Sequence, residues 1–345
     1  MHAESRAPLV LLSQRLGGVT PVEERLAELG AEVRGAALWS LPEIRENGAG
    51  ARVIILGAVE PFDAATLEAL PQLEAVVRRG VGTDNVDLDA ATRLGIVVAN
   101  VPDASVEEVS DHALAMFLAI ERSLVSLDRG VHDGAWAHDP SAILALRRPI
   151  RRLRSLTLGV IGFGRIGQAL ARKALGVYGR VLTADPIVSA ERAESLGIGL
   201  VPLDELIASA DHLSVHAPLT PATRNLIDGA AIARMPKGSV LVNTARGGLV
   251  DEAGVLEAVA SGHLRGAGLD VTASEPLPPD SPLLAEPRIL LTAHSASSSS
   301  TSDRELAERS VDAAFEIVAG RRPASIANPD VYRSQALRAS ALREG

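Results

Sequence analysis

Three glycines at a fixed spacing constrain the fold of this chain more than any other feature. Gly162, Gly164 and Gly167 form a G-x-G-x-x-G pattern that follows an apolar run and opens a helical pattern. In such a pattern the first glycine permits a tight turn, the second lets backbone approach a pyrophosphate, and the third allows helix and strand to pack closely. The free N–H groups at the helix start favour phosphate. The pattern alone is also compatible with a glycine-rich turn that binds nothing.

An acidic residue further along the chain strengthens the prediction of a dinucleotide site. Asp185 ends the next predicted strand, about 20 residues beyond the glycines, where an acid would meet the ribose 2′-hydroxyl. A carboxylate there would repel a 2′-phosphate, and Pro186, Ile187 and Val188 offer no arginine to hold one. We therefore expect the cofactor to be NAD rather than NADP.

The alternation of short apolar runs with helical patterns predicts parallel sheets covered on both faces. A chain of 345 residues is too long for one core, so we expect an α/β fold with two doubly wound domains. Strands are predicted at 8–12, 53–56, 73–77, 96–100, 156–161, 180–184, 212–215, 239–243, 267–270 and 289–292. Helices are predicted at 21–29, 106–131, 164–176, 251–261 and 302–318.

Composition excludes several classes of function. The net charge of -9 and an aromatic content of 2% disfavour a nucleic-acid partner. The absence of cysteine rules out disulfides and thiolate metal sites, and we predict no metal. No stretch has the length of a membrane span or a signal-peptide core, so a cytoplasmic protein is expected. The five arginines within 147–154 are interpreted as a solvated connection, and 334–345 as a loose tail.

Three polar segments directly follow predicted strands of the second half, where ligands bind in doubly wound sheets. Arg246 could hold a substrate carboxylate with its planar guanidinium. His294 could exchange a proton with a ketone oxygen, and Glu275 could favour the charged form of that imidazole. Each residue has an ordinary alternative: a surface salt bridge for Arg246, a turn cap for Glu275 and a structural histidine for His294.

These segments also resemble a known family. The stretches 77–87, 101–108, 243–252 and 268–271, together with Glu275-Pro276, are similar to motifs of the D-isomer-specific 2-hydroxyacid dehydrogenases. Among them the chain looks most similar to the C-terminal-binding-protein branch. The resemblance implies a Rossmann NAD domain inserted in a flavodoxin-like substrate domain. It places the NAD domain at 102–294 and the discontinuous substrate domain at 1–101 and 295–333.

The resemblance implies an NAD-dependent enzyme that moves a hydride between nicotinamide and C2 of a small 2-hydroxy or 2-keto acid, with D-specificity and a homodimeric state. It implies that Arg246, Glu275 and His294 are catalytic and that Arg78, Val81, Gly82, Arg246 and His294 bind substrate. The cofactor residues, taken from the glycine pattern and the resemblance together, are Gly162, Gly164, Arg165, Ile166, Gly167, Asp185, His216, Ala217, Pro218, Thr223, Thr244, Ala245 and Asp270.

The chain departs from the family pattern at two positions. Ala293 stands where the family has proline before the catalytic histidine, and Ser297 stands where the closest branch has tryptophan. An NAD-sensing dimeric scaffold with little turnover is kept as an alternative to the enzyme, because the branch that the chain resembles most includes regulators whose NAD binding drives dimerisation. A formate dehydrogenase is disfavoured because that relative has glutamine where Glu275 stands.

Overall fold

The computed structural model describes residues 7–18 and 20–343, and it divides into two compact units. The first unit comprises 1–105 with 299–345, and the second comprises 106–298. Each unit holds one sheet in which every strand pair is parallel. Within the described residues, no helix combines the length and the apolar character needed to cross a membrane. Two parallel-sheet α/β units confirm the predicted fold class.

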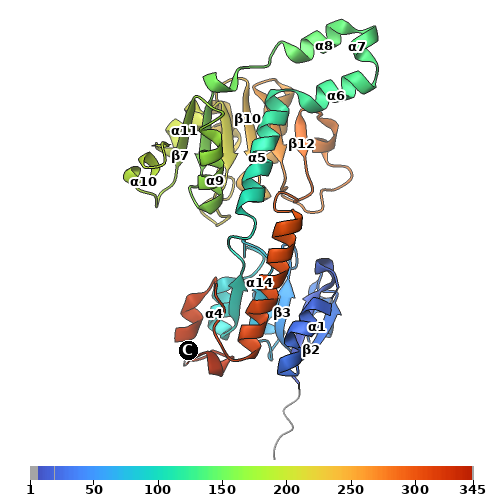
Figure 1. The fold of residues 1–345 in the computed structure, drawn as a ribbon, viewed down its shortest axis with the longest axis vertical. Coiled ribbons are helices and arrows are strands. Elements are labelled where there is room, and N and C mark those ends of the chain that lie inside the picture. The colour runs from blue at the N-terminus through green and yellow to red at the C-terminus, as the bar shows by residue number, and fades with distance from the viewer. Residues whose placement is uncertain (1–6, 19, 344–345) are drawn as a thin grey trace, which may run out of the picture. The chain divides into compact units, whose positions relative to one another are not determined.

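The first unit is a five-stranded sheet in the order β2-β1-β3-β4-β5, the flavodoxin-like order. Its strands are β1 Leu9–Ser13, β2 Glu32–Ala36, β3 Ala51–Leu56, β4 Ala75–Arg78 and β5 Val97–Asn100. Its helices are α1 Thr20–Leu26, α2 Leu41–Asn47, α3 Ala64–Glu68, α4 Leu88–Leu94 and α14 Ser300–Val318. One buried cluster includes residues of α1 and α14, and another includes residues of α2, α3 and α4. Both faces of the sheet are therefore covered, as Figure 1 shows for α1 and α14.

The second unit is a seven-stranded sheet in the order β12-β11-β10-β9-β6-β7-β8. Its strands are β6 Thr157–Ile161, β7 Arg180–Ala184, β8 Gly199–Leu200, β9 His212–Val215, β10 Ser239–Asn243, β11 Leu264–Leu269 and β12 Ile289–Leu291. Its helices are α5 Val106–Glu121, α6 Leu124–His132, α7 Ala135–His138, α8 Pro140–Arg147, α9 Arg165–Ala174, α10 Ala190–Glu194, α11 Leu203–Ser209, α12 Gly229–Arg234 and α13 Glu252–Ala260. The order reverses between β6 and β9, which makes this point of the sheet the expected ligand crevice.

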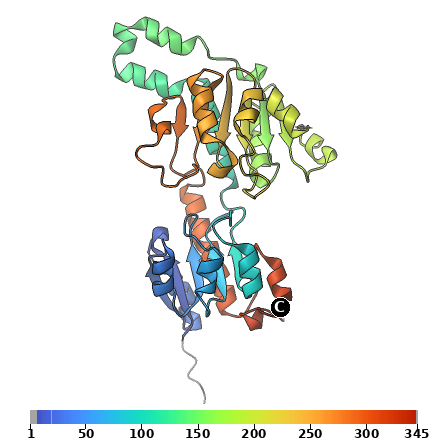
Figure 2. The same ribbon diagram turned by 180° about the vertical axis from the view of Figure 1, so that it is seen from behind.

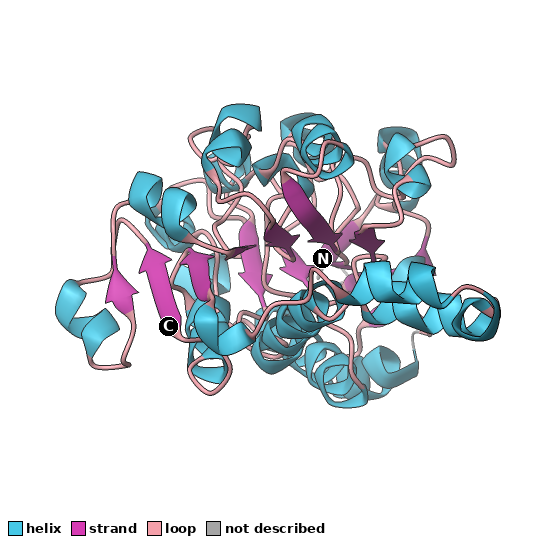
Figure 3. Cartoon of the chain, turned by 90° about the horizontal axis from the view of Figure 1, so that it is seen from above, coloured by secondary structure: helices cyan, strands magenta, loops and turns pink. Residues whose placement is uncertain are grey.

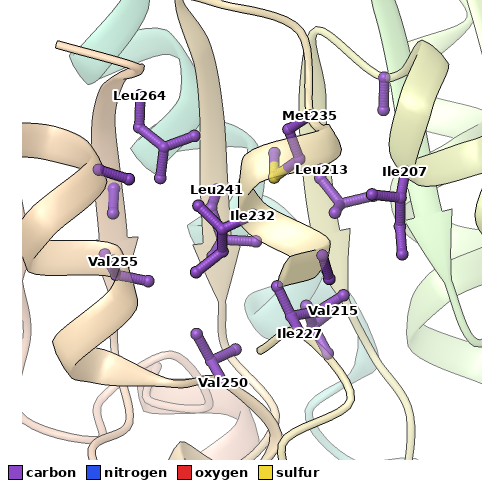
Figure 4. Close-up of a cluster of buried hydrophobic side chains, with 14 of the residues drawn as sticks. Ile207, Leu213, Val215, Ile227, Ile232, Met235, Leu241, Val250, Val255 and Leu264 are labelled. Atoms are coloured by element: carbon purple, nitrogen blue, oxygen red, sulfur yellow. The ribbon is translucent and has the colours of Figure 1, made fainter. Parts of the chain in front are cut away.

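Helices cover both faces of the seven-stranded sheet, as the opposite views of Figures 1 and 2 show. Helices α5 and α9 pack on one face through a buried cluster that includes Phe117 and Leu170. Helices α11, α12 and α13 pack on the other through a larger cluster of aliphatic side chains (Figure 4). Figure 3 shows the strands lying between layers of helices. The cores are thus built mainly from Val, Leu, Ile and Ala, as expected for a chain with few aromatic residues.

Several predicted elements differ from the structure. The helix expected at 106–131 is two helices, because Ser123 adopts φ 53 between α5 and α6. Arg265 ends α5 by donating hydrogen bonds to the Glu121 carbonyl (2.9 Å) and the Ser123 hydroxyl (3.1 Å). The edge strands β2 and β8 were not predicted. Strand β2 buries only two side chains, and β8 is two residues long.

Two segments expected to be solvated are partly packed. Within 147–154, Arg151 is only 28% exposed and pairs with the buried carboxylate of Glu121 at 2.8 Å, so the segment is not a purely solvated connection. The tail expected to be loose also differs, because Leu337 and Leu342 are buried in the core of the first unit. Their apolar side chains explain the packing, although the segment around them is polar.

The serine run at the start of α14 has a local structural function. Ser299 is the N-cap of the helix, and its hydroxyl accepts a hydrogen bond from the backbone N–H of Ser302 at 2.9 Å. The Ser302 hydroxyl accepts from the Ser299 backbone N–H at 3.0 Å, which completes a capping box. The run therefore fixes where the chain enters the helix.

Candidate functional site

The glycine loop lies directly after β6 and begins α9. Gly162 has φ +85, and a Cβ atom there would lie 2.8 Å from the His216 carbonyl carbon. A Cβ at Gly167 would lie 2.1 Å from the Gly162 carbonyl oxygen. Both positions therefore require glycine. A Cβ at Gly164 would meet nothing within 4 Å, so open space faces the first turn of α9, where Arg165 and Ile166 lie.

Asp185 connects the end of β7 to this loop. One carboxylate oxygen accepts the backbone N–H of Phe163 at 2.7 Å. The other accepts the backbone N–H groups of Ile187 at 2.8 Å and Val188 at 3.2 Å. The carboxylate is thus held at the carboxyl end of the sheet beside the glycine loop. This is where the sequence predicted an acid for the ribose.

The next predicted cofactor residues follow β9 on the far side of the crevice. His216 is half-buried, and its Nε2 lies 2.9 Å from the Ser214 hydroxyl. Burial lowers the pKa of His216 to about 4, so its imidazole is neutral near pH 7. Ala217 and Pro218 come next, and the Thr223 hydroxyl donates to the Pro218 carbonyl at 2.6 Å. These residues form a turn outside β9.

The loop after β10 carries Arg246 in a fixed backbone conformation. The buried Asn243 side chain accepts the Ala245 N–H at 3.0 Å and donates to the Arg246 carbonyl at 2.8 Å. The Arg246 guanidinium donates to the Ala245 carbonyl at 2.6 Å. Thr244 is 8% exposed, and its hydroxyl has no hydrogen-bond partner within residues 7–18 and 20–343. A buried hydroxyl of this kind is suited to a ligand.

The loops after β10 and β11 lie against each other. A Cβ at Gly247 would lie 2.0 Å from the Thr272 carbonyl carbon, so only glycine allows this approach. The Thr272 N–H donates to Glu275 at 3.1 Å, which holds that carboxylate in the second loop. Arg246 and Glu275 therefore belong to adjacent loops.

Glu275 and His294 form a direct carboxylate–imidazole pair. The Glu275 Oε2 lies 2.6 Å from the His294 Nδ1, and the two side chains are 22% and 29% exposed. This leaves Nε2 as the ring nitrogen available to a substrate, since Nδ1 is engaged. His294 has φ +50, a left-handed conformation that costs roughly 1–2 kcal/mol for a residue with a side chain.

Asp270 holds the loop that carries this histidine. Its backbone carbonyl accepts the His294 N–H at 2.8 Å. Its carboxylate is 2% exposed and accepts the N–H groups of Ser295 at 2.8 Å and Ala296 at 3.0 Å. The Thr292 hydroxyl donates to the same carboxylate at 2.6 Å. Asp270 therefore fixes both sides of His294.

The predicted substrate residues of the N-terminal segment lie in the first unit. Arg78 is the last residue of β4, is 6% exposed, and donates to the Arg79 carbonyl at 2.6 Å. The Val81 carbonyl accepts from the Asn100 amide at 2.8 Å. Val81 and Gly82 thus lie in a loop held at the carboxyl end of that unit's own sheet.

Two residues that contact the loops around Glu275 and His294 were not predicted from the sequence. His112 on α5 lies 3.0 Å from the Thr292 hydroxyl, and Glu252 accepts the Ala273 N–H next to the Glu275 loop. Glu252 lies inside a motif that was noted for its resemblance, so its position gave a signal. His112 lies in the middle of a helix, where no strand end or spacing marks it.

The arrangement in the second unit fits a dinucleotide. Three features lie at strand ends around the point where the strand order of the sheet reverses. They are the open space at Gly164, the carboxylate at the end of β7 and the buried Thr244 hydroxyl. An acid–imidazole pair lies in the loops beyond them. Together they provide a place for a cofactor and a group that can exchange a proton.

Comparison with known proteins gives the same picture. Residues 114–296 match the family model described as D-isomer specific 2-hydroxyacid dehydrogenase, NAD binding domain. The chain is 40% identical over 309 residues to a D-3-phosphoglycerate dehydrogenase of Mycobacterium tuberculosis, covering 86% of this chain and 54% of the relative. It is 37% identical to a glyoxylate reductase of Korarchaeum cryptofilum, covering 79% of this chain and 82% of the relative.

A solved structure agrees with the fold. A D-lactate dehydrogenase of Aquifex aeolicus, solved in complex with NAD and lactic acid, aligns with a TM-score of 0.81 at 29% identity, covering 92% of this chain and 99% of that one. The chain spans about half the length of the D-3-phosphoglycerate dehydrogenases it matches. The chain belongs to the D-isomer specific 2-hydroxyacid dehydrogenase family.

Proposed function

We propose that the chain transfers a hydride between NAD and C2 of a small 2-hydroxy or 2-keto acid, with D-specificity. The observation that carries this proposal is the 2.6 Å pair of Glu275 and His294 in loops beyond the strand ends of the NAD-binding unit. Such a pair can give a proton to the C2 oxygen while a hydride reaches the carbon. NAD, when bound, supplies or accepts that hydride.

Three side chains act on the substrate in this proposal. Arg246 binds the substrate carboxylate through its planar guanidinium, which orients C2. His294 donates its Nε2 proton to the ketone oxygen during reduction and accepts it during oxidation. Glu275 fixes the ring through Nδ1 and stabilises the imidazolium form. Reduction thus adds one hydride to carbon and one proton to oxygen, and oxidation reverses both.

The strand-end residues of the second unit hold the cofactor in this proposal. The first turn of α9 takes the pyrophosphate, with Arg165 and Ile166 beside it, and Asp185 accepts from the ribose. The turn after β9 lines the crevice. Thr244, Ala245 and Asp270 lie on the nicotinamide side, where the buried Thr244 hydroxyl supports a ligand contact.

We further propose that the first unit binds substrate through the loop after β4. The backbone N–H groups of Val81 and Gly82 hold a carboxylate there, with Arg78 nearby. The positive φ of Gly80 and the Asn100 hydrogen bond to the Val81 carbonyl fix this loop, which supports a binding role. The substrate is proposed to be a short, small 2-keto acid, as the name of the glyoxylate reductase relative suggests.

An NAD-sensing scaffold of the C-terminal-binding-protein type is the second candidate. Ser297, which stands where that branch has tryptophan, argues against this candidate. The relatives are named as dehydrogenases and reductases, which favours turnover. The two candidates predict different outcomes in one assay.

The test mixes the whole chain with NADH and a panel of glyoxylate, hydroxypyruvate, pyruvate and longer 2-keto acids. The enzyme hypothesis predicts loss of NADH absorbance with at least one acid. It also predicts a fall of roughly 10²- to 10⁴-fold in turnover for His294→Ala, because general acid catalysis is lost. NADH binding without turnover of any acid would contradict the enzyme and support the sensor.

We also propose that the chain forms a homodimer through the arm made by α6, α7 and α8. The arm projects from the second unit and packs mainly on itself (Figure 1). It exposes large apolar side chains, with Trp136 66% exposed and Leu124 53% exposed. A groove of about 870 Å³ lies beside it, lined by Val125, Leu146 and Leu284 among others. Exposed apolar surface of this kind marks an interaction site.

Light scattering tests the dimer. The wild-type chain is expected at twice 36.0 kDa, and Trp136→Glu is expected at one chain mass because a charge enters the apolar contact. The matched control is Ile187→Glu, which changes a 92% exposed residue outside the arm and should stay dimeric. A monomeric wild type would contradict the proposal.

A further inference from the structure

Helix α5 lies unusually close to β11, and this brings His112 to the site. His112, Met116 and Ile120 share one helix face, since they are spaced by four residues. A Cβ at Gly268 would lie 2.9 Å from the Met116 sulfur, and a Cβ at Gly266 would lie 2.9 Å from the Ile120 side chain. The two glycines of β11 thus allow the helix to approach.

The directions of the hydrogen bonds around His112 follow from simple chemistry. A carboxylate only accepts, so the Thr292 hydroxyl must donate its proton to Asp270, at 2.6 Å. The Thr292 oxygen can then only accept at its 3.0 Å contact with the His112 Nε2. His112 must therefore carry a proton on Nε2. The contacts form one chain of donors that runs from His112 through Thr292 to Asp270.

This donor chain ends on the group that holds the catalytic loop. Asp270 accepts the N–H groups of Ser295 and Ala296 through its carboxylate and that of His294 through its carbonyl. His294 adopts a left-handed backbone conformation, which persists only where surrounding contacts hold it. The orientation of Asp270 therefore controls where the His294 ring lies.

We propose that His112 is a positioning residue for the reaction, acting through Thr292 and Asp270 to hold His294 in register. The inference rests on the proposed function, because it assigns a purpose to the His294 position. His112 does not touch the reacting atoms. Its loss should lower kcat by about 10- to 100-fold, since small misplacement of a catalytic group is costly, while KM changes by less than about threefold.

Paired variants separate a donor function from simple packing. His112→Gln keeps an N–H near the Nε2 position, whereas His112→Leu removes it. Thr292→Ser keeps the hydroxyl, and Thr292→Val removes it. We expect His112→Gln and Thr292→Ser to retain most of kcat. We expect the double variant of His112→Leu with Thr292→Val to lose no more than Thr292→Val alone, because both break the same chain of donors.

A matched control is available in the same unit. His263 is also half-buried, and its ring nitrogen lies 2.9 Å from the Ile232 carbonyl, away from the proposed donor chain. His263→Leu should leave kcat within about twofold, as expected for a site with no link to His294. Losses equal for His112→Gln and His112→Leu, or additive losses in the double variant, would overturn the proposal.

A second readout does not depend on turnover. In the full chain labelled with ¹⁵N-histidine, the ring of His112 should show its proton on Nε2, and Thr292→Val should alter that signal. A proton on Nδ1 in the neutral ring would overturn the donor chain. If the wild type binds NADH but reduces no acid while His112 carries its proton on Nε2, the proposed function fails and the donor chain stands.

Discussion

The NAD-binding unit contains two carboxylate–imidazole pairs that are alike in chemistry and opposite in setting. Glu275 and His294 are 2.6 Å apart and 22% and 29% exposed, and they lie in loops after β11 and β12. Glu121 and His212 are 3.1 Å apart and fully buried, at the end of α5 and the start of β9. One pair lies at the carboxyl end of the strands and the other at the amino end.

The buried pair is held on every side. The Tyr178 hydroxyl lies 2.7 Å from the His212 Nδ1, and the Phe117 ring stacks on the imidazole with centroids 5.0 Å apart. Arg151 pairs with Glu121 at 2.8 Å. Burial lowers the pKa of His212 despite the neighbouring Glu121 carboxylate, so the ring stays neutral. The Nε2–H of His212 then donates a hydrogen bond to the Glu121 carboxylate, and its Nδ1 accepts one from the Tyr178 hydroxyl.

An acid beside an imidazole therefore does not by itself define a catalytic site. Both rings have a carboxylate partner, yet only the His294 ring is in a loop that a ligand can reach. The His212 pair has no spare ring nitrogen and no exposed surface, so it stabilises the fold. Exposure and position at the strand ends distinguish the two functions.

The largest expected effect concerns the buried pair. Glu121→Gln should lower the free energy of unfolding by roughly 3–5 kcal/mol, because Arg151 and Arg265 lose a buried counter-charge. Denaturant unfolding followed by circular dichroism measures it. Asp204→Asn is the matched control, since that carboxylate is 79% exposed in its pair with Arg234 and should cost at most about 1 kcal/mol. An equal loss of unfolding free energy in both variants would contradict the structural role proposed for the buried pair.

The stability of the unit should also depend on acid pH through Glu121. Burial opposes its ionisation, but hydrogen bonds from His212 and Arg151 outweigh burial and lower its pKa from 4.5 to about 2. A carboxylate with a lowered folded pKa gives stability that is present above its unfolded pKa. That stability, about 3 kcal/mol, should be lost as the pH falls from about 4.5 to about 2.

Unfolding curves between pH 7 and pH 2 measure this dependence. Glu121→Gln should show a shallower loss of stability over the same range, because the variant has no carboxylate to titrate. A variant whose curve parallels the wild type would show that another group causes the acid sensitivity.

The smallest expected change in free energy concerns the exposed pair. Glu275→Gln keeps a hydrogen-bond acceptor for the His294 Nδ1 but removes the charge that stabilises the imidazolium. Turnover should fall by about 10- to 100-fold, a part of what general acid catalysis contributes. The free energy of unfolding should change by at most about 1 kcal/mol, because an ion pair that water reaches contributes little to stability. Steady-state kinetics and unfolding curves measure the two effects. A Glu275→Gln variant that loses stability but keeps its turnover would contradict the assignment of this pair to catalysis.

The candidate site was largely predictable because its residues follow strands in recognisable patterns. Gly162, Asp185, Arg246 and His294 each come directly after a buried apolar run, and parallel strands bring their carboxyl ends together. The same reasoning predicted most strands of both sheets. It missed β2, which buries only two side chains, and β8, which is two residues long.

The rest depended on contacts between distant elements. His112 lies 180 residues from Thr292, and Glu121 lies 91 residues from His212. Both His112 and Glu121 are polar residues inside a helical pattern, which on its own predicts a solvated face. Only the close approach of α5 to the sheet brings His112 into contact with Thr292, just after β12, and Glu121 into contact with His212 in β9.

The proposed function requires direct hydride transfer between nicotinamide and C2 of the acid. The measurement that tests it is product analysis after reduction of glyoxylate, hydroxypyruvate or pyruvate with NADH deuterated at C4 of the nicotinamide. Direct transfer places one deuterium on C2 of the 2-hydroxy acid, and D-specificity gives the D product where C2 is chiral without the label. Both hydrogens at C4 must be deuterium in this experiment, because only one of the two is transferred. No hydroxy acid, or deuterium released to water instead of carbon, would contradict direct transfer.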